Sequence, residues 1–218
     1  MSILDALDIN TRNPGRINGV AAGIVTNNQD PDCLGRIKIR FPWLSDNNET
    51  DWVRMATLMS GSARGTFFLP EVGDEVLVVF EHGDINHPYA IGSLWNSSAQ
   101  PPETNSDGNN NIRKIRSRSG HEIIFNDDDN AMQEKIEIHT NAGHKILLDD
   151  SSGQEKIEIT DKTGSNKIIV DSVQNSINIE SAMQLKIKSQ IIEIEAGATM
   201  TIKAGGTLTI QGALVKIN

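Results

Sequence analysis

The chain has 218 residues, of which 37% are hydrophobic and 22% charged, as is ordinary for a globular protein. Its formal net charge of −9 argues against general nucleic-acid binding, and its single cysteine excludes a disulfide framework and a thiolate metal site. No apolar run is long enough to span a membrane and no secretory signal is evident at the N-terminus, which predicts synthesis and folding in a cytoplasm.

After an N-terminal extension, residues 1–14, the segment 15–96 is predicted to form an OB-fold collar domain. Alternation of apolar and polar residues predicts five strands, near Ile17–Thr26, Leu34–Phe41, Trp52–Leu58, Glu75–Glu81 and Tyr89–Trp95. Turn-forming segments such as "SGSARG" and "HGDINHP" separate them. Five short strands without a long helix are typical of an OB-type barrel.

The composition then changes abruptly. All nine aromatic residues lie at or before Phe125, and all seven prolines lie at or before Pro102. Between the two regions, residues 97–111 are polar and turn-forming, which predicts a linker. Residues 112–218 follow as a separate spike domain.

This second region is repetitive. "GHEIIFND", "GHKILLDD" and "GSNKIIVD" recur 23 and then 21 residues apart, and "EKIEIHT" is echoed by "EKIEITD" and "NSINIES". The repeats then shorten, with isoleucines at steps of seven or eight residues: Ile187, Ile194, Ile202, Ile210 and Ile217. Such repeats predict an elongated stack in which no unit buries its own apolar face.

Each repeat has too few apolar residues to offset the entropy cost of ordering it in a single chain. Ordering eight residues costs roughly 8–16 kcal/mol of backbone entropy, whereas each buried isoleucine returns only about 1.5–3 kcal/mol. Three copies around a common axis would cover one another's apolar faces. We therefore expect an all-β homotrimer, an N-terminal OB-fold barrel followed by an intertwined triple-stranded β-helix. The predicted trimer core comprises Ile123, Phe125, Ile146, Leu148, Ile168, Val170, Ile187, Ile194, Ile202, Ile210 and Ile217.

Polar residues recur at one place in the repeat. His121 and His144 share strand parity with the predicted core residues, and Asn166 takes the matching place in the third repeat. Three copies of each would form a polar layer on the axis, either structurally satisfied or holding a water, an anion or a metal ion. No other metal or cofactor site is expected.

Other polar clusters have simple structural interpretations. For His82, Asp84 and His87 we expect a hairpin rather than a metal site, and for Asp30–Asp32 a turn rather than a calcium site. Two groups of basic residues fit either phosphate contact or protein contact: Arg36, Lys38 and Arg40 in one strand, and Arg113, Lys114, Arg116 and Arg118 at the start of the spike. No catalytic arrangement is evident, so no enzyme is expected.

Three long segments identify a family resemblance. "CLGRIKIRFPWL", "DWVRMATLMSGSARGTFFLPEVGDEVLVVFEHGDINHPYAIGSLWN" and "SGHEIIFNDDDNAMQEKIEIHTNAGHKILLDD" closely resemble the central spike proteins of contractile tails, namely phage baseplate assembly protein V and the VgrG proteins of type VI secretion. The resemblance implies an OB collar, a β-helical needle and a homotrimer at the tip of an injection tube. It also implies assembly in the bacterial cytoplasm and a place in the baseplate of a phage virion or injection particle.

The resemblance further implies partners. VgrG proteins carry a large hub domain before the OB fold, so a separate hub protein is expected to bind this collar. A small PAAR-type protein is expected to cap the far end, in contact with Leu214, Val215 and Ile217. The spike would close the tube and puncture the target envelope on sheath contraction, with transient contact with the membrane. The alternative is an OB-fold nucleic-acid-binding protein with a multimerising β-helical tail.

Overall fold

The structure is a computed structural model that describes residues 16–44, 48–130 and 132–217, so the predicted extension 1–14 lies outside it. The chain divides into two compact units, Met1–Ser106 and Asp107–Asn218, and the boundary lies within the predicted linker. The described residues contain β-strands and one short 3-10 helix, so the fold is all-β. None of the described helices has the length and hydropathy needed to cross a membrane.

The first unit contains a curled five-stranded sheet with the strand order β2-β1-β6-β7-β3. Register shifts between Val25 and Asn27 and between Leu77 and Val78 mark bulges, which bend a sheet toward closure. The 3-10 helix η1 (Glu81–Gly83) links the two longest-paired strands, β6 and β7. The elements are β1 (Val20–Asn27), β2 (Lys38–Arg40), β3 (Arg54–Met55), the hairpin β4 (Ser60–Gly61) and β5 (Arg64–Gly65), β6 (Glu75–Phe80) and β7 (Pro88–Leu94).

This unit has a core of its own. Alternate residues of the central strand β6 are buried, because strand side chains point alternately to the two faces of a sheet. The core comprises Val25, Ile37, Ile39, Phe41, Val53, Val76, Val78, Phe80 and Ala90. The rings of Phe41 and Phe80 pack with their centroids 5.7 Å apart. The predicted OB-like barrel is confirmed for this region.

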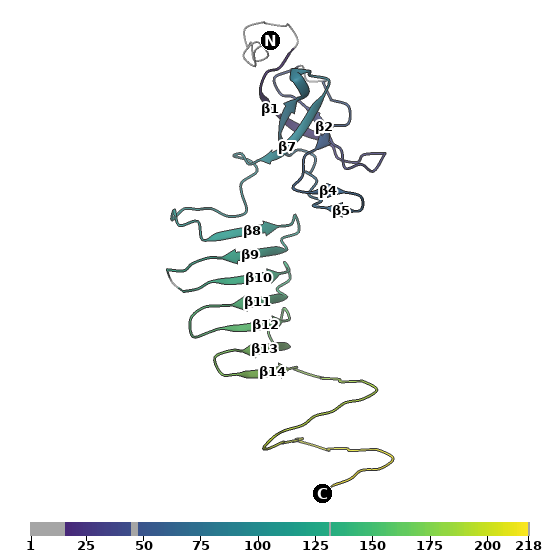
Figure 1. Cartoon of the computed structure of the whole chain (residues 1–218), viewed down its shortest axis with the longest axis vertical. Coiled ribbons are helices and arrows are strands. Elements are labelled where there is room, and N and C mark those ends of the chain that lie inside the picture. Colours follow the sequence, from purple (N-terminus) through teal and green to yellow (C-terminus); the bar gives the residue numbers. More distant parts are fainter. Residues whose placement is uncertain (1–15, 45–47, 131, 218) are drawn as a thin grey trace, which may run out of the picture. The chain divides into compact units, whose positions relative to one another are not determined.

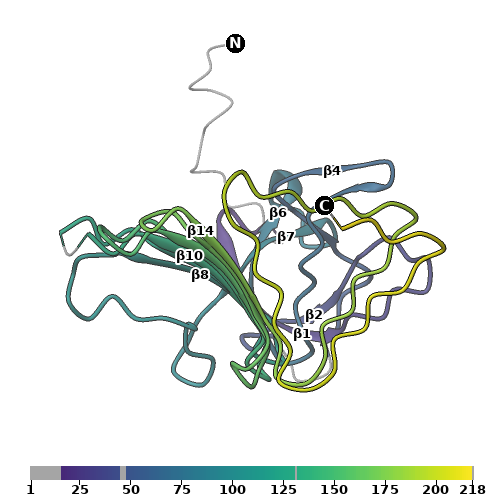
Figure 2. The same ribbon diagram turned by 90° about the horizontal axis from the view of Figure 1, so that it is seen from below.

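The second unit is a regular antiparallel meander of seven strands, ordered β8 to β14 as in the sequence. Figure 1 shows the strands stacked like rungs, with their turns on alternating sides, and Figure 2 looks along the stack. The strands are β8 (Ile112–Arg116), β9 (Glu122–Asn126), β10 (Lys135–His139), β11 (Lys145–Asp149), β12 (Lys156–Thr160), β13 (Lys167–Asp171) and β14 (Ser176–Glu180).

The meander modifies the expectation of an intertwined β-helix across residues 112–218. From β8 to β14, each backbone ladder joins consecutive strands of the same chain. The chain can reverse because Gly120, Gly143 and Gly164 adopt positive φ angles of 87°, 100° and 73° in equivalent turns. Intertwining of separate copies remains a prediction for residues 181–217 only.

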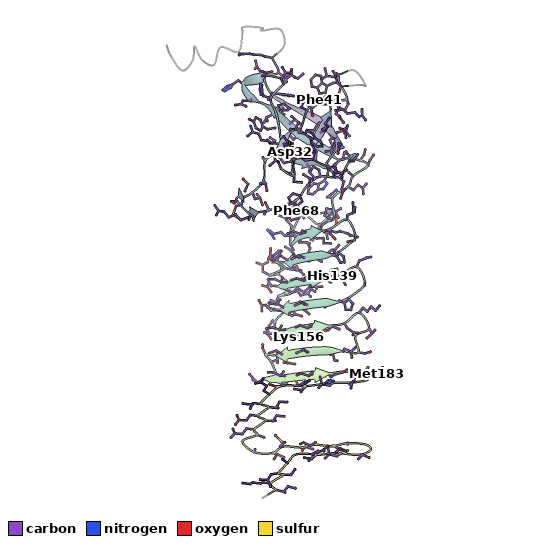
Figure 3. The ribbon with its side chains drawn as sticks, turned by 90° about the vertical axis from the view of Figure 1, so that its right-hand side faces the viewer. Asp32, Phe41, Phe68, His139, Lys156 and Met183 are labelled. Carbon is purple, nitrogen blue, oxygen red and sulfur yellow. The ribbon has the colours of Figure 1, made fainter. Side chains whose placement is uncertain are left out.

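Residues 181–217 form no strand and are exposed throughout. In Figure 3 they run as a single thread without a neighbouring strand, from about Met183 onward. An extended backbone whose ladder groups are unpaired within its own chain needs an outside partner to become stable.

Candidate assembly surface

One face of the β8–β14 sheet is apolar and uncovered. Its side chains, except Ile123, are between 36% and 70% exposed. The set comprises Ile115, Ile123, Phe125, Ile136, Ile138, Ile146, Leu148, Ile157, Ile159, Ile168, Val170, Ile177 and Ile179. An exposed apolar surface of this extent marks a site of interaction.

The apolar face consists of two columns fixed by the register. One column passes through Ile115, Ile123, Ile138, Ile146, Ile159, Ile168 and Ile179. The other passes through Phe125, Ile136, Leu148, Ile157, Val170 and Ile177. Six predicted core residues, Ile123, Phe125, Ile146, Leu148, Ile168 and Val170, therefore lie together on this face; whether copies cover it remains a prediction.

The prediction missed half of this face. Ile136, Ile138, Ile157, Ile159, Ile177 and Ile179 are the cross-strand neighbours of the predicted residues. The signal was present in the "KIEI" and "INI" repeats. Those repeats alternate with the same parity, so they point to the same face of an antiparallel sheet.

The opposite face has a central row in which Ile124, Leu147 and Ile169 alternate with Glu137 and Glu158, and its charged residues pair with one another. Glu122 is buried, with Arg116 Nη1 at 3.0 Å and His139 Nε2 at 3.2 Å from its carboxylate oxygens. Lys135 pairs with Glu137, and Lys156 with Glu158, across 3.2 and 2.9 Å. Hydrogen bonds from Thr160 and then Lys156 lower the pKa of Glu158. A face whose charged side chains are paired with one another is compatible with exposure to solvent. The apolar face is therefore the candidate surface for assembly.

The predicted polar positions lie at one edge of the apolar face. His121, His144 and Asn166 line an apolar groove of about 940 Å³ together with residues of the first column. His121 Nδ1 accepts the N–H of Asn141, and His144 Nδ1 accepts the N–H of Lys162, both across 3.3 Å.

Asn166 acts in the same way, because its Oδ1 accepts the N–H of Ala182 across 3.1 Å. Its amide also donates to Asp161, and this bond is the main cause that lowers the pKa of Asp161 to about 2. All three residues therefore fasten one turn to the next along the same edge of the sheet. An axial ion layer at these positions remains a proposal.

The predicted core and tip residues of the tail have no intrachain burial. Ile187, Ile194, Ile202, Ile210 and Ile217, like Leu214 and Val215, are exposed large hydrophobic residues. No backbone ladder within the described residues holds them. Their orientation toward an axis remains a prediction.

In the first unit, Asp30 organises the loop before β2. Arg36 donates to both of its carboxylate oxygens, at 2.8 and 2.7 Å, and the backbone N–H groups of Asp32 and Leu34 also point to it. The Arg36 guanidinium is the largest cause that holds the pKa of Asp30 well below its ordinary value. The Asp30 carboxylate thus stabilises the loop before β2 by accepting these hydrogen bonds.

The other polar clusters of this unit also have partners within the chain. Lys38 pairs with Glu49 across 2.9 Å. The backbone N–H of Asn86, followed by the His87 ring, lowers the pKa of Asp84. His82 occupies the 3-10 turn, with a positive φ of 51°. These contacts describe a hairpin and one surface ion pair.

The first unit also has an exposed apolar surface around the β4–β5 hairpin. Leu34, Leu58, Phe67 and Phe68 are all more than two-thirds exposed. They line a groove of about 980 Å³ that also includes Met55 and Ile91. Figure 3 labels Phe68. This second surface has the composition of a protein contact rather than of a polar ligand site.

Comparison with known proteins shows what the first unit resembles. Residues 21–95 match the family model described as the type VI secretion system/phage-baseplate injector OB domain. The chain is 31% identical to the type VI secretion system spike protein VgrG3 of Vibrio cholerae over 126 residues, which is 54% of this chain and 12% of that protein.

Two Pseudomonas aeruginosa spike proteins give similar matches. VgrG1a is 28% identical over 127 residues, 54% of this chain and 20% of that protein. VgrG5 is 34% identical over 113 residues, 43% of this chain and 14% of that protein. The matched region thus spans a fifth or less of the length of these relatives.

Proposed function

We infer, from an injector-type OB domain followed by a sheet with an uncovered apolar face, that this chain is the central spike of a contractile tail or injection machine. The resemblance to VgrG spike proteins over about half the chain supports a spike or baseplate role. The apolar face of β8–β14 is the observation that carries the trimeric form of the proposal.

Three copies would enclose this face completely. Each sheet would form one side of a three-sided prism, with its isoleucine columns inside and its ion pairs in water. Residues 181–217 would continue the prism by pairing with the same segment of the other two copies. Every ladder group of the tail would then have a partner, which a lone chain cannot provide.

The proposed mechanism is mechanical. Sheath contraction drives the spike forward, and the narrow prism concentrates the force on a small area of the target envelope. Regular backbone ladders and a dry apolar interior resist bending and compression. Before firing, the spike closes the tube, and the chain's own residues need no chemical step. We propose assembly in the bacterial cytoplasm and incorporation into the baseplate.

Two protein partners complete the proposal. A hub protein would bind the first unit, and the exposed groove around Leu58, Phe67 and Phe68 supports a contact there. A PAAR-type protein would cover the apolar residues Leu214, Val215 and Ile217. The nucleic-acid alternative finds less support, because Arg36 in the loop before β2 and Lys38 in β2 are already paired with Asp30 and Glu49.

The test combines mass and location. Light scattering of the purified full chain should give three times the 23.8 kDa of one chain, and an antibody against the OB unit should label one end of isolated particles by electron microscopy. A stable monomer at micromolar concentration would contradict the trimer, and label along the sheath or on no particle would contradict the spike role. Retardation of single-stranded DNA by the purified chain in a gel assay would support the nucleic-acid-binding alternative.

A further inference from the structure

The two edges of the β8–β14 sheet differ in charge. The acidic edge consists of the turns 127–134, 150–155 and 172–175, which hold six carboxylates and no lysine or arginine. The histidine edge consists of the turns 117–121, 140–144 and 161–166, whose charged residues are Arg118, Lys162 and Asp161. Asp161 is occupied in its own turn by Thr163 and Asn166. The acidic edge stays net negative although Arg113 pairs with Asp127 there, whereas the histidine edge is neutral to basic.

The histidine edge also presents hydrogen-bond donors. His121 and His144 each accept a backbone N–H on Nδ1. An imidazole that accepts at Nδ1 carries its hydrogen on Nε2, so each ring has an N–H left to donate. Both side chains are exposed in the single chain, so these donors are accessible to another copy.

We propose that copies of this chain join head to tail, with the histidine edge of one sheet against the acidic edge of the next. This inference rests on the proposed trimer and specifies its contact. Rotation about an axis along the stack always brings unlike edges together, whereas a twofold axis across the stack would set acidic edge against acidic edge. The charge difference therefore favours copies that point in the same direction.

The same rotation also sets which residues meet. A rotation about this axis moves no residue along the axis. The first residue of a strand in one copy therefore lies at the same height as the last residue of the same strand in the next copy. His121 and Asp127 flank β9, and His144 and Asp150 flank β11. His144 Nε2–H thus donates to Asp150 of the next copy. At the first level His121 Nε2–H donates to Oδ1 of Asp127, because Arg113 of the same chain occupies Oδ2 of that carboxylate. At the third level Asn166 faces the uncharged Ser172.

The groove at the histidine edge supplies the apolar part of the contact. Its floor is the column that contains Ile123, Ile146 and Ile168. The column nearer the acidic edge contains Phe125, Leu148 and Val170. At each corner of the prism, this second column of one copy enters the groove of its neighbour.

Disulfide trapping tests the contact directly. In a Cys33→Ser background, His144→Cys and Asp150→Cys are introduced into the same full-length chain. The two positions lie at opposite ends of β11, about 20 Å apart at the rise of a strand, and a disulfide requires Cα atoms within about 7 Å. Any disulfide between them must therefore join two copies.

Mild oxidation should convert the double variant into a covalent trimer on a non-reducing denaturing gel, and reductant should return it to single chains. Each single variant should remain uncross-linked, since like edges never meet. The pair His121→Cys and Asp127→Cys repeats the test at the two ends of β9. A folding defect caused by one pair of substitutions would then not remove the cross-link from both tests.

Light scattering before oxidation separates the two proposals. A trimer that gives no covalent product with either pair, or that gives dimers with a single variant, would overturn the head-to-tail contact while leaving the spike proposal intact. A monomer that never cross-links would overturn both.

Discussion

The two units of this chain use their hydrophobic residues in opposite ways. In the described part of the first unit, nine hydrophobic side chains are buried among themselves, from Val25 to Ala90. In the described part of the second unit, Leu147 is the only buried hydrophobic side chain, although isoleucine is far more frequent there. The first unit thus buries a core of its own, whereas on our proposal the second unit buries its apolar face only in an assembly.

The difference follows from sheet geometry. A curled sheet with bulges closes on itself and buries one face. The β8–β14 meander turns back every five residues without closing, so its apolar face stays outside. Stability of the first unit should therefore not depend on protein concentration, whereas stability of the second unit should depend on it strongly.

The largest expected effect comes from a charge on the apolar face. Ile146→Asp would place a carboxylate between Ile138 and Ile159, where assembly would bury it at a cost of several kcal/mol per chain. Light scattering should show monomers, with the melting of the first unit unchanged. Asn178→Asp puts the same group on the opposite face of β14 and should leave the trimer intact. Equal behaviour of the two variants would contradict the assigned faces.

The tail offers a similar comparison with a smaller effect. Ile202→Asp should lower the melting temperature of the assembly, because the predicted orientation brings three such carboxylates together. Thr201→Asp, one residue away and on the other side by strand parity, should be tolerated. Calorimetry at equal concentration is the measurement. A larger loss in the Thr201 variant would reverse the predicted orientation of the tail.

A core substitution in the first unit should affect that unit alone. Ile39 is fully buried, and Ile39→Ala should cost about 2–5 kcal/mol of unfolding free energy. The transition of the first unit should fall by the same amount at every protein concentration, while light scattering still reports a trimer. Loss of the trimer in this variant would show that the two units do not fold independently.

The smallest effect concerns pH. The pKa of Asp30 is lowered mainly by Arg36, so its contribution to stability is present above the ordinary aspartate pKa near 4 and is lost as pH falls below it. The first unit should therefore become progressively less stable as the pH falls below about 4, and this loss should be complete only below the lowered pKa of Asp30. Asp30→Asn should be less stable at pH 7 and show a shallower dependence on pH. If the stability of the Asp30→Asn variant depended on pH as steeply as that of the original chain, Asp30 would not be the source of the pH dependence.

Strands were predicted best where alternation alone decides them. The predicted Glu75–Glu81 and Tyr89–Trp95 nearly coincide with β6 and β7. The predicted Leu34–Phe41 proved too long, because β2 begins only at Lys38 and Asp30 holds the preceding residues in a loop. Such side-chain contacts leave no periodic signal in the sequence.

The meander was harder to anticipate. The isoleucine repeat specifies an apolar face but not whether the next strand belongs to the same chain. That choice depends on turns, and the glycines at positive φ in the "GH" repeats were the available clue. The pairing of His121 with Asn141 across 20 residues is a tertiary contact, which spacing alone does not reveal.

Amide hydrogen exchange on the full chain tests the central claim most directly, because it reports on both units in one sample. At high concentration, amides of β8–β14 and of residues 181–217 should be protected. On dilution below the assembly threshold, protection should disappear from residues 181–217 and weaken in β8–β14, while β1, β6 and β7 keep theirs. Tail amides that remain protected in a monomer, or that exchange freely in a trimer, would contradict the account.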